Sequence, residues 1–292
     1  MSNCRIFPFN RWSDTTLGTI SSSGEIAAYP ASNTQKQQIS KMWRSSGDPA
    51  STNPNLSRDL GSAFRISSAC IVAHNLTKDG QFRVRVSNNS DMSSPLYDSG
   101  FLYIWTSFLP TASEFSDGTG RPNAALIKLL EFCSENPRVT REITFTEVTG
   151  RYIQVDFQDS TNTDGFIQIS YVYAGLYIEL DDNVAYGWEI MPESVNRIHR
   201  AASGQFWIDL LYTRLRANAN APTQGEVITV AFWEFMFSLL GVTKEWIISI
   251  RDTRVSVAFW VTFLCHFPKV PRTSNPAIRR YGIPIEVEEL VG

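Results

Sequence analysis

Cysteine and histidine are scarce in this 292-residue chain, which contains 4 Cys and 3 His. These residues are Cys4, Cys70, Cys133 and Cys265, and His74, His199 and His266. No CxxC pair and no zinc-type histidine spacing occurs among them, so their pattern predicts neither a metal site nor a cofactor site. The cysteines stand mostly in apolar or strand-like contexts, and we expect free, buried thiols from a reduced compartment.

An excess of basic charge is also missing. The chain has 26 Lys+Arg against 29 Asp+Glu and no basic cluster, which argues against nucleic acid as the main partner. The N-terminal segment "MSNCRIFPFNRWSD" lacks a charged start followed by an apolar core, so we expect no secretion signal and synthesis in a cytoplasm. The apolar run 227–240 contains Glu234 and is shorter than the roughly 20 residues of a membrane span.

Sequence motifs of catalysis are absent too. No nucleophile elbow, phosphate-binding loop or dinucleotide-binding glycine pattern occurs. Paired carboxylates could hydrolyse glycosidic bonds, and the aspartates at strand ends and turns that could serve are Asp156, Asp159, Asp164, Asp181 and Asp182. Aspartate is common at such positions for local hydrogen-bonding reasons. We therefore predict no catalytic residue and a protein that is not an enzyme.

Alternation of apolar and polar residues dominates from Phe64 to about Tyr177. The segments "FRISSACIVAHNL", "QFRVRVS", "REITFTEV", "RYIQVDF" and "GFIQISYVYAGLYIEL" read as strands separated by turn sequences such as Lys-Asp-Gly. Short strands at this spacing predict a mainly β, antiparallel sandwich or barrel.

The pattern changes after Asp182. "SGQFWIDLLYTRLRA", "EWIISIRD", "RVSVAFWVTFLCHF" and "YGIPIEVEELVG" predict further strands. Between the first two, Thr223 and Glu226 form a capping-box spacing and Gly241 follows an apolar run, which predicts a helix at about 224–240. A helix that is apolar almost all round has to be covered on most sides.

His74 lies where an apolar strand meets a turn, within "NLSRDLGSAFRISSACIVAHNL". This stretch resembles the discoidin-like, galactose-binding jelly roll, in which Asp-Leu-Gly (residues 59–61 here) precedes an apolar strand with a His-Asn tip. "WRS", "FRVRVSNN", "LYDSG" and "GRYIQVDFQDSTNTDGFIQISYVYAG" follow the family order, so the resemblance covers about residues 40–178. It implies an antiparallel jelly-roll β-sandwich at 35–182. It also implies that His74 and Asn75 cap a strand and bond local backbone rather than a metal.

Some members of that family bind sugars at a loop-rich end of the sandwich. The segment "FLYIWTSFLP" carries the candidate glycan or docking surface, which consists of Tyr103, Trp105 and Phe108. Core packing and subunit contact are the alternatives for these aromatic residues.

The C-terminal part resembles the ring-forming domain of phage distal tail and baseplate proteins in its order of elements. That resemblance implies a tail-assembly β domain built from 1–34 plus 183–292, with the apolar helix, and a structural role in a phage tail tip or baseplate. The implied partners are sibling copies in a ring, other tail proteins and a host surface glycan, and the implied location is the virion tail. Candidate subunit-interface residues, with ordinary core as the alternative, are Trp233, Phe237, Trp246 and Trp260. The competing hypotheses are a carbohydrate-binding module attached to an enzyme domain, and a glycosidase.

Overall fold

The structure is a computed structural model that describes residues 4–47, 49, 52–77, 79–104, 140–179, 189–200, 206–224, 236, 238, 240–241, 244–252, 259–268, 274–277 and 280–290. The described strands form one antiparallel network of 15 strands, so the predicted mainly β, antiparallel fold is confirmed. The elements in chain order are β1 (Arg5–Asn10), β2 (Ile20–Ser22), the 3-10 helix η1 (Ala31–Gln35), β3 (Trp43–Arg44), β4 (Asn55–His74), β5 (Gln81–Ser87), β6 (Tyr97–Asp98), β7 (Leu102–Tyr103), β8 (Arg141–Gln158), β9 (Gln168–Glu179), β10 (Glu189–Arg200), β11 (Phe206–Gln224), β12 (Trp246–Asp252), β13 (Phe259–His266), β14 (Ser274–Ala277) and β15 (Arg280–Glu289).

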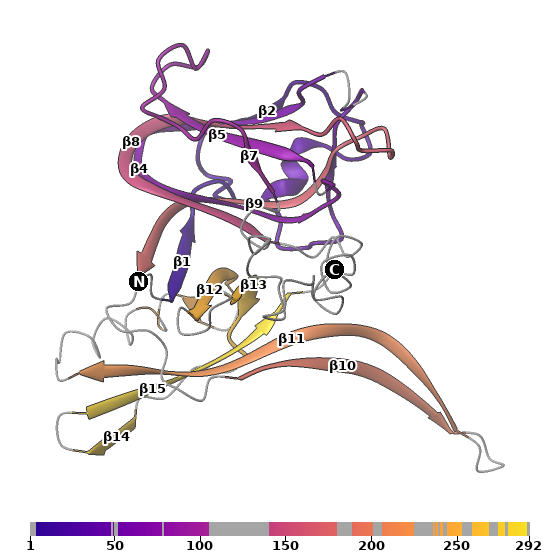
Figure 1. The fold of residues 1–292 in the computed structure, drawn as a ribbon, viewed down its shortest axis with the longest axis vertical. Helices are drawn as coiled ribbons and strands as arrows, with labels where there is room; N and C mark the ends of the chain where they lie inside the picture. The colour runs from indigo at the N-terminus through magenta and orange to yellow at the C-terminus, as the bar shows by residue number, and fades with distance from the viewer. Residues whose placement is uncertain are drawn as a thin grey trace, which may run out of the picture.

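Two long strands, β4 and β8, bend together from one layer of the sandwich to the other (Figure 1). Their pairing skips from Asp59 to Phe64 at the bend, where Gly61 has φ +75°. Glycine adopts this left-handed conformation without the steric penalty of a side chain. Beyond the bend, β4 pairs with β9 as well as with β8, while its first half pairs with β2. The bend therefore lets one pair of strands contribute to both layers.

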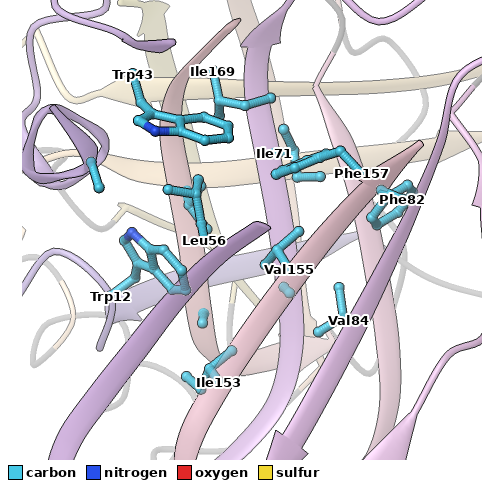
Figure 2. Packing of buried hydrophobic residues seen from close by; sticks show 14 of the residues in the cluster. Trp12, Trp43, Leu56, Ile71, Phe82, Val84, Ile153, Val155, Phe157 and Ile169 are labelled. Carbon is cyan, nitrogen blue, oxygen red and sulfur yellow. The ribbon is translucent and has the colours of Figure 1, made fainter. Parts of the chain in front are cut away.

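The sandwich closes around an apolar cluster drawn from both layers (Figure 2). Trp43 and Phe157 lie with their ring centroids 6.0 Å apart. In β5, Phe82 and Val84 point into the cluster, as their alternate positions along the strand require. Trp12 also belongs to this cluster, and its indole Nε1 donates to Thr34 Oγ1 at 3.0 Å. Segments before residue 35 therefore pack against the sandwich.

A second group of strands (β10, β11, β12, β13, β14 and β15) follows the sandwich, and β1 joins the two groups. β1 pairs with β9 on one side and with β12 on the other. A buried apolar cluster lies at this junction, where Phe7, Tyr171 and Tyr173 meet Ile247 and Leu264. The outward face of β9 is thus covered by the C-terminal strands.

The domain prediction of 35–182 and 1–34 plus 183–292 stays a prediction. Residues before 35 contact both groups of strands, since Trp12 packs in the sandwich and β1 pairs with β12, so these contacts do not assign the N-terminal segment to one group. The predicted helix at about 224–240 lies mostly outside the described residues, although Met236, Ser238 and Leu240 have helical backbone. Met236 and Leu240 are buried against Trp246 and other C-terminal residues. No helix in the described part of the chain has the length and apolar character that crossing a membrane requires.

Candidate functional site

His74 and Asn75 bond the backbone at the end of β4, as predicted. His74 is buried, and its Nδ1 accepts a hydrogen bond from the Leu76 backbone N–H at 3.2 Å. The Asn75 amide donates to the Phe166 carbonyl at 2.9 Å, and its Oδ1 accepts from the Gln168 N–H at 2.7 Å. These bonds tie the β4–β5 turn to the loop before β9.

Burial governs the chemistry of His74. Desolvation lowers its pKa from 6.5 to about 4, although nearby Asp159 acts in the opposite direction. The imidazole is therefore neutral at neutral pH. Its Nε2 is buried and has no hydrogen-bond partner among the described residues, which also contain no cluster of His, Cys, Asp or Glu suited to a metal ion.

The aspartates that could have formed a glycosidase pair make hydrogen bonds within the chain, where the structure describes them. Asp159 accepts hydrogen bonds from both the backbone N–H and the hydroxyl of Thr77, at 2.7 and 2.8 Å. Asp156 accepts two hydrogen bonds from the Arg85 guanidinium, each at 3.0 Å. Asp164 accepts from the Asn75 amide at 2.8 Å. Asp181 and Asp182 lie outside the described residues.

The outward face of β5 carries a row of polar side chains, because Gln81, Arg83 and Arg85 alternate with the buried Phe82 and Val84. Cross-strand register adds the neighbours on this face: Tyr103 pairs with Gln81, Asp98 with Arg85, and Asp156 with Arg83. We call this set (Gln81, Arg83, Arg85, Asp98, Tyr103 and Asp156) the polar face.

Charges on the polar face are paired. The Arg83 guanidinium donates to both oxygens of Asp98, with Nε to Oδ1 at 2.7 Å. That hydrogen bond lowers the pKa of Asp98 and raises the pKa of Arg83. Arg85 is paired with Asp156, whose side chain is 9% exposed. Two fixed cations and two fixed anions thus offer donors and acceptors without net charge.

Tyr103 is the aromatic member of the polar face, and it is 46% exposed. The predicted companions Trp105 and Phe108 lie outside the described residues, so the candidate surface stays a prediction. Sequence reasoning missed the two Arg–Asp pairs. The spacing of Arg83 and Arg85 in a strand does place both on one face, but the acidic partners come from other strands.

The candidate interface residues are described only in part. Trp246 is 1% exposed and packs against Phe267, with ring centroids 4.8 Å apart. It therefore lies in the core of its own chain, which was the alternative for this residue. The backbone of Trp260 pairs with Arg251 between β13 and β12. Trp233, Phe237 and the side chain of Trp260 lie outside what the structure describes.

The β10–β11 hairpin is a long curved ribbon that reaches beyond β15 (Figure 1). β15 pairs with β11 only from Arg216 to Gln224. Among described residues, the 206–215 part of β11 pairs with β10 alone. At the base of the hairpin, Arg214 forms ion pairs with Glu193 on β10 and with Glu288 on β15. These ion pairs connect the β10–β11 hairpin to β15.

Two comparisons with known proteins found nothing: no family model matches the chain, and no curated protein matches it. Solved structures do show a likeness. The family 32 CBM from C. perfringens NanJ, solved in complex with galactose, is 17% identical, covers 60% of this chain and 99% of its own, and has a TM-score of 0.37.

Two further solved structures show a likeness of similar extent. The lectin domain of Lectinolysin, complexed with Lewis B antigen, is 12% identical, covers 53% of this chain and 90% of its own, and has a TM-score of 0.34. A Streptococcus pneumoniae fucose binding module is 10% identical, covers 57% and 95%, and has a TM-score of 0.36. Identities and TM-scores this low assign no ligand to the present chain.

Proposed function

We propose that this chain is a non-catalytic binding protein whose sandwich holds carbohydrate on the polar face. The observation that supports this function is the exposed Tyr103 ring beside the Arg83–Asp98 pair. An aromatic ring offers an apolar surface on which the C–H face of a sugar can pack. Fixed guanidinium and carboxylate groups next to it donate to and accept from hydroxyls.

The balance of charge on the polar face favours a neutral ligand. Arg83 and Arg85 are each matched by an aspartate, so an ionic ligand would gain little from the net field. A polyhydroxyl ligand needs donors and acceptors side by side, and the two ion pairs together with Gln81 supply both. A neutral sugar residue is therefore the ligand class we infer.

A glycan array followed by calorimetric titration of the best glycan tests this function on the full chain. We expect Tyr103→Ala to weaken binding by about tenfold or more, because the ring contact is lost. Leu96→Ala is the matched control, since Leu96 is similarly exposed at 47% but lies outside the polar face. Absence of binding to any glycan, or equal affinity for wild type and Tyr103→Ala, would overturn the proposal.

The second candidate function is a structural subunit of a phage tail tip or baseplate, located in the virion and assembled with its own copies and other tail proteins. The projecting hairpin supports it. Isolated two-stranded ribbons are at best marginally stable in water, and the sequence "FWIDLLY" within the two-stranded part of β11 is largely apolar. Contacts of the hairpin with a different surface of the next copy would be head-to-tail, and such contacts form a ring where the rotation between copies closes. Glycan binding by the sandwich is compatible with this role.

Sedimentation velocity on the full chain tests assembly. We expect a defined oligomer for wild type and a monomer for a variant in which residues 196–211 are replaced by an Asn-Gly turn. That replacement leaves Val195 and Tyr212, which are paired, next to a favoured hairpin turn. A wild-type chain that stays monomeric at high concentration contradicts the assembly role, whatever the glycan titration shows.

A further inference from the structure

A pocket of about 390 Å³ opens at the junction between the sandwich and the C-terminal strands. Its volume falls in the range of small-molecule sites, which often form where two structural units meet. Most of its lining residues are polar, and none of them belongs to the polar face. The lining residues are Pro8, Phe9, Asn10, Arg11, Ser13, Asp14, Gln35, Gln37, Lys244 and Glu245.

Glu245 is the distinctive group in this pocket, which we call the junction pocket. It directly precedes β12, and its Oε1 accepts a hydrogen bond from the Tyr171 hydroxyl at 3.0 Å. The Tyr171 side chain is buried, at 1% exposure, and belongs to the apolar junction cluster. Burial raises the pKa of Glu245, although hydrogen bonds from Tyr171 and Gln37 partly oppose this effect.

Neither cation of the junction pocket forms a salt bridge with Glu245 among the described residues. The Arg11 guanidinium stacks instead over the Phe64 ring, 4.8 Å from its centroid. Lys244 is exposed and lines the pocket next to Glu245, and its charge lowers the pKa of Glu245, although the two side chains form no salt bridge among the described residues. Glu245 is thus a partly buried carboxylate whose hydrogen-bond donors Tyr171 and Gln37 are neutral, and no described cation forms a salt bridge with it.

A second carboxylate lines the same pocket. Asp14 accepts from the Thr16 hydroxyl at 2.6 Å and from its N–H at 3.0 Å. These hydrogen bonds to Thr16 lower the pKa of Asp14, so it is ionised at neutral pH. The amides of Gln35 and Gln37 add further donors and acceptors.

We propose that the junction pocket binds a small polyhydroxyl compound that carries a primary ammonium group, with the ammonium against Glu245. A partly buried carboxylate with no cation in direct contact is costly, and an ammonium group that reaches it recovers part of that cost. The hydroxyls would bond Asp14 and the glutamine amides. The site is distinct from the neutral-sugar surface of the polar face, and its ligand class differs by the positive charge.

Glucosamine and glucose form a matched pair of probes, because they differ at one substituent that is ammonium in one and hydroxyl in the other. Titration of the full chain, followed by calorimetry or NMR shifts at constant ionic strength, measures both affinities. We expect glucosamine to bind about tenfold or more tightly than glucose, the range of a charge-assisted hydrogen bond. Glu245→Gln should remove that preference, while the exposed Glu147→Gln should retain it.

Other outcomes overturn the proposal. Equal affinities for glucosamine and glucose, or undetectable binding of both, would mean that the junction pocket has no ammonium-binding site. A preference that survives in Glu245→Gln but disappears in Tyr103→Ala places the ligand on the polar face instead. Asp14→Asn provides a second variant, expected to weaken both probes, in case Glu245→Gln disturbs the fold as judged by circular dichroism. Failure here leaves neutral-glycan binding untouched, because that function is tested through Tyr103.

Discussion

The Tyr171 hydroxyl donates to Glu245 at 3.0 Å, which links β9 of the sandwich to the start of β12. Tyr171 is buried, and desolvation strongly raises the pKa of its phenol, so it remains a neutral donor. This bond places a carboxylate in the apolar junction between the two groups of strands. A charge in these partly buried surroundings costs free energy of folding.

Glu245→Gln should make the protein more stable at pH 7. Burial raises the pKa of Glu245 above its ordinary value of 4.5, so the native state favours the protonated form. The stability that this group contributes is complete below pH 4.5 and is lost as pH rises through the raised pKa. Glutamine imitates the protonated form and lacks this loss. Thermal unfolding at pH 7 and pH 4 should show a higher Tm for the variant at pH 7 only; a lower Tm at pH 7 contradicts the prediction.

His74 should make the chain sensitive to acid. Its pKa falls from 6.5 to about 4 on folding, so its contribution to stability is complete above pH 6.5 and is lost as pH falls through 4. The full shift corresponds to about 3 kcal/mol. Urea unfolding between pH 7 and pH 4 measures it. His74→Asn, which keeps an acceptor for the Leu76 N–H, should lose correspondingly less free energy of unfolding over this range, whereas equal losses for both proteins would refute the assignment.

The strands were predicted because alternation is a local pattern, whereas the His74–Asn75 cap was implied by the resemblance to the jelly-roll family. The alternation in "QFRVRVS" can be recognised without knowledge of the fold. The polar face was missed because Asp98 and Asp156 reach Arg83 and Arg85 only through the registers of β6 and β8. The contact between Tyr171 and Glu245 was missed for a similar reason, since it depends on the pairing of β1 with both β9 and β12.

Strand lengths show the same limit of local patterns. β4 begins at Asn55, before the alternating run predicted from Phe64, because the residues ahead of the bend at Gly61 pair with β2 and β8. β11 continues to Gln224, beyond the strand segment predicted at 203–217, since β15 supplies a partner for its last residues. Neighbouring strands, rather than local composition, decide where these elements stop.

Gly61→Val should destabilise the protein by about 1–2 kcal/mol, the cost of placing a β-branched residue in the left-handed region. Gly61 has φ +75°, and a Cβ there would meet only ordinary contacts, the nearest at 3.6 Å. The penalty is therefore conformational rather than steric crowding. Gly61→Asn should cost less, because asparagine tolerates this conformation. Equal losses for the two variants in chemical denaturation would refute this reason.

Phe7 should couple the two groups of strands during unfolding. Its ring contacts Tyr173 edge-on at 5.7 Å between centroids and lies in the cluster that includes Ile247 and Leu264. Phe7→Ala should cost about 3–5 kcal/mol, as other large-to-small core substitutions do. Because the lost contacts join the sandwich to β12 and β13, we expect one calorimetric transition in wild type and two in the variant. A single transition at an unchanged Tm in Phe7→Ala would mean that the junction contributes little to cooperative folding.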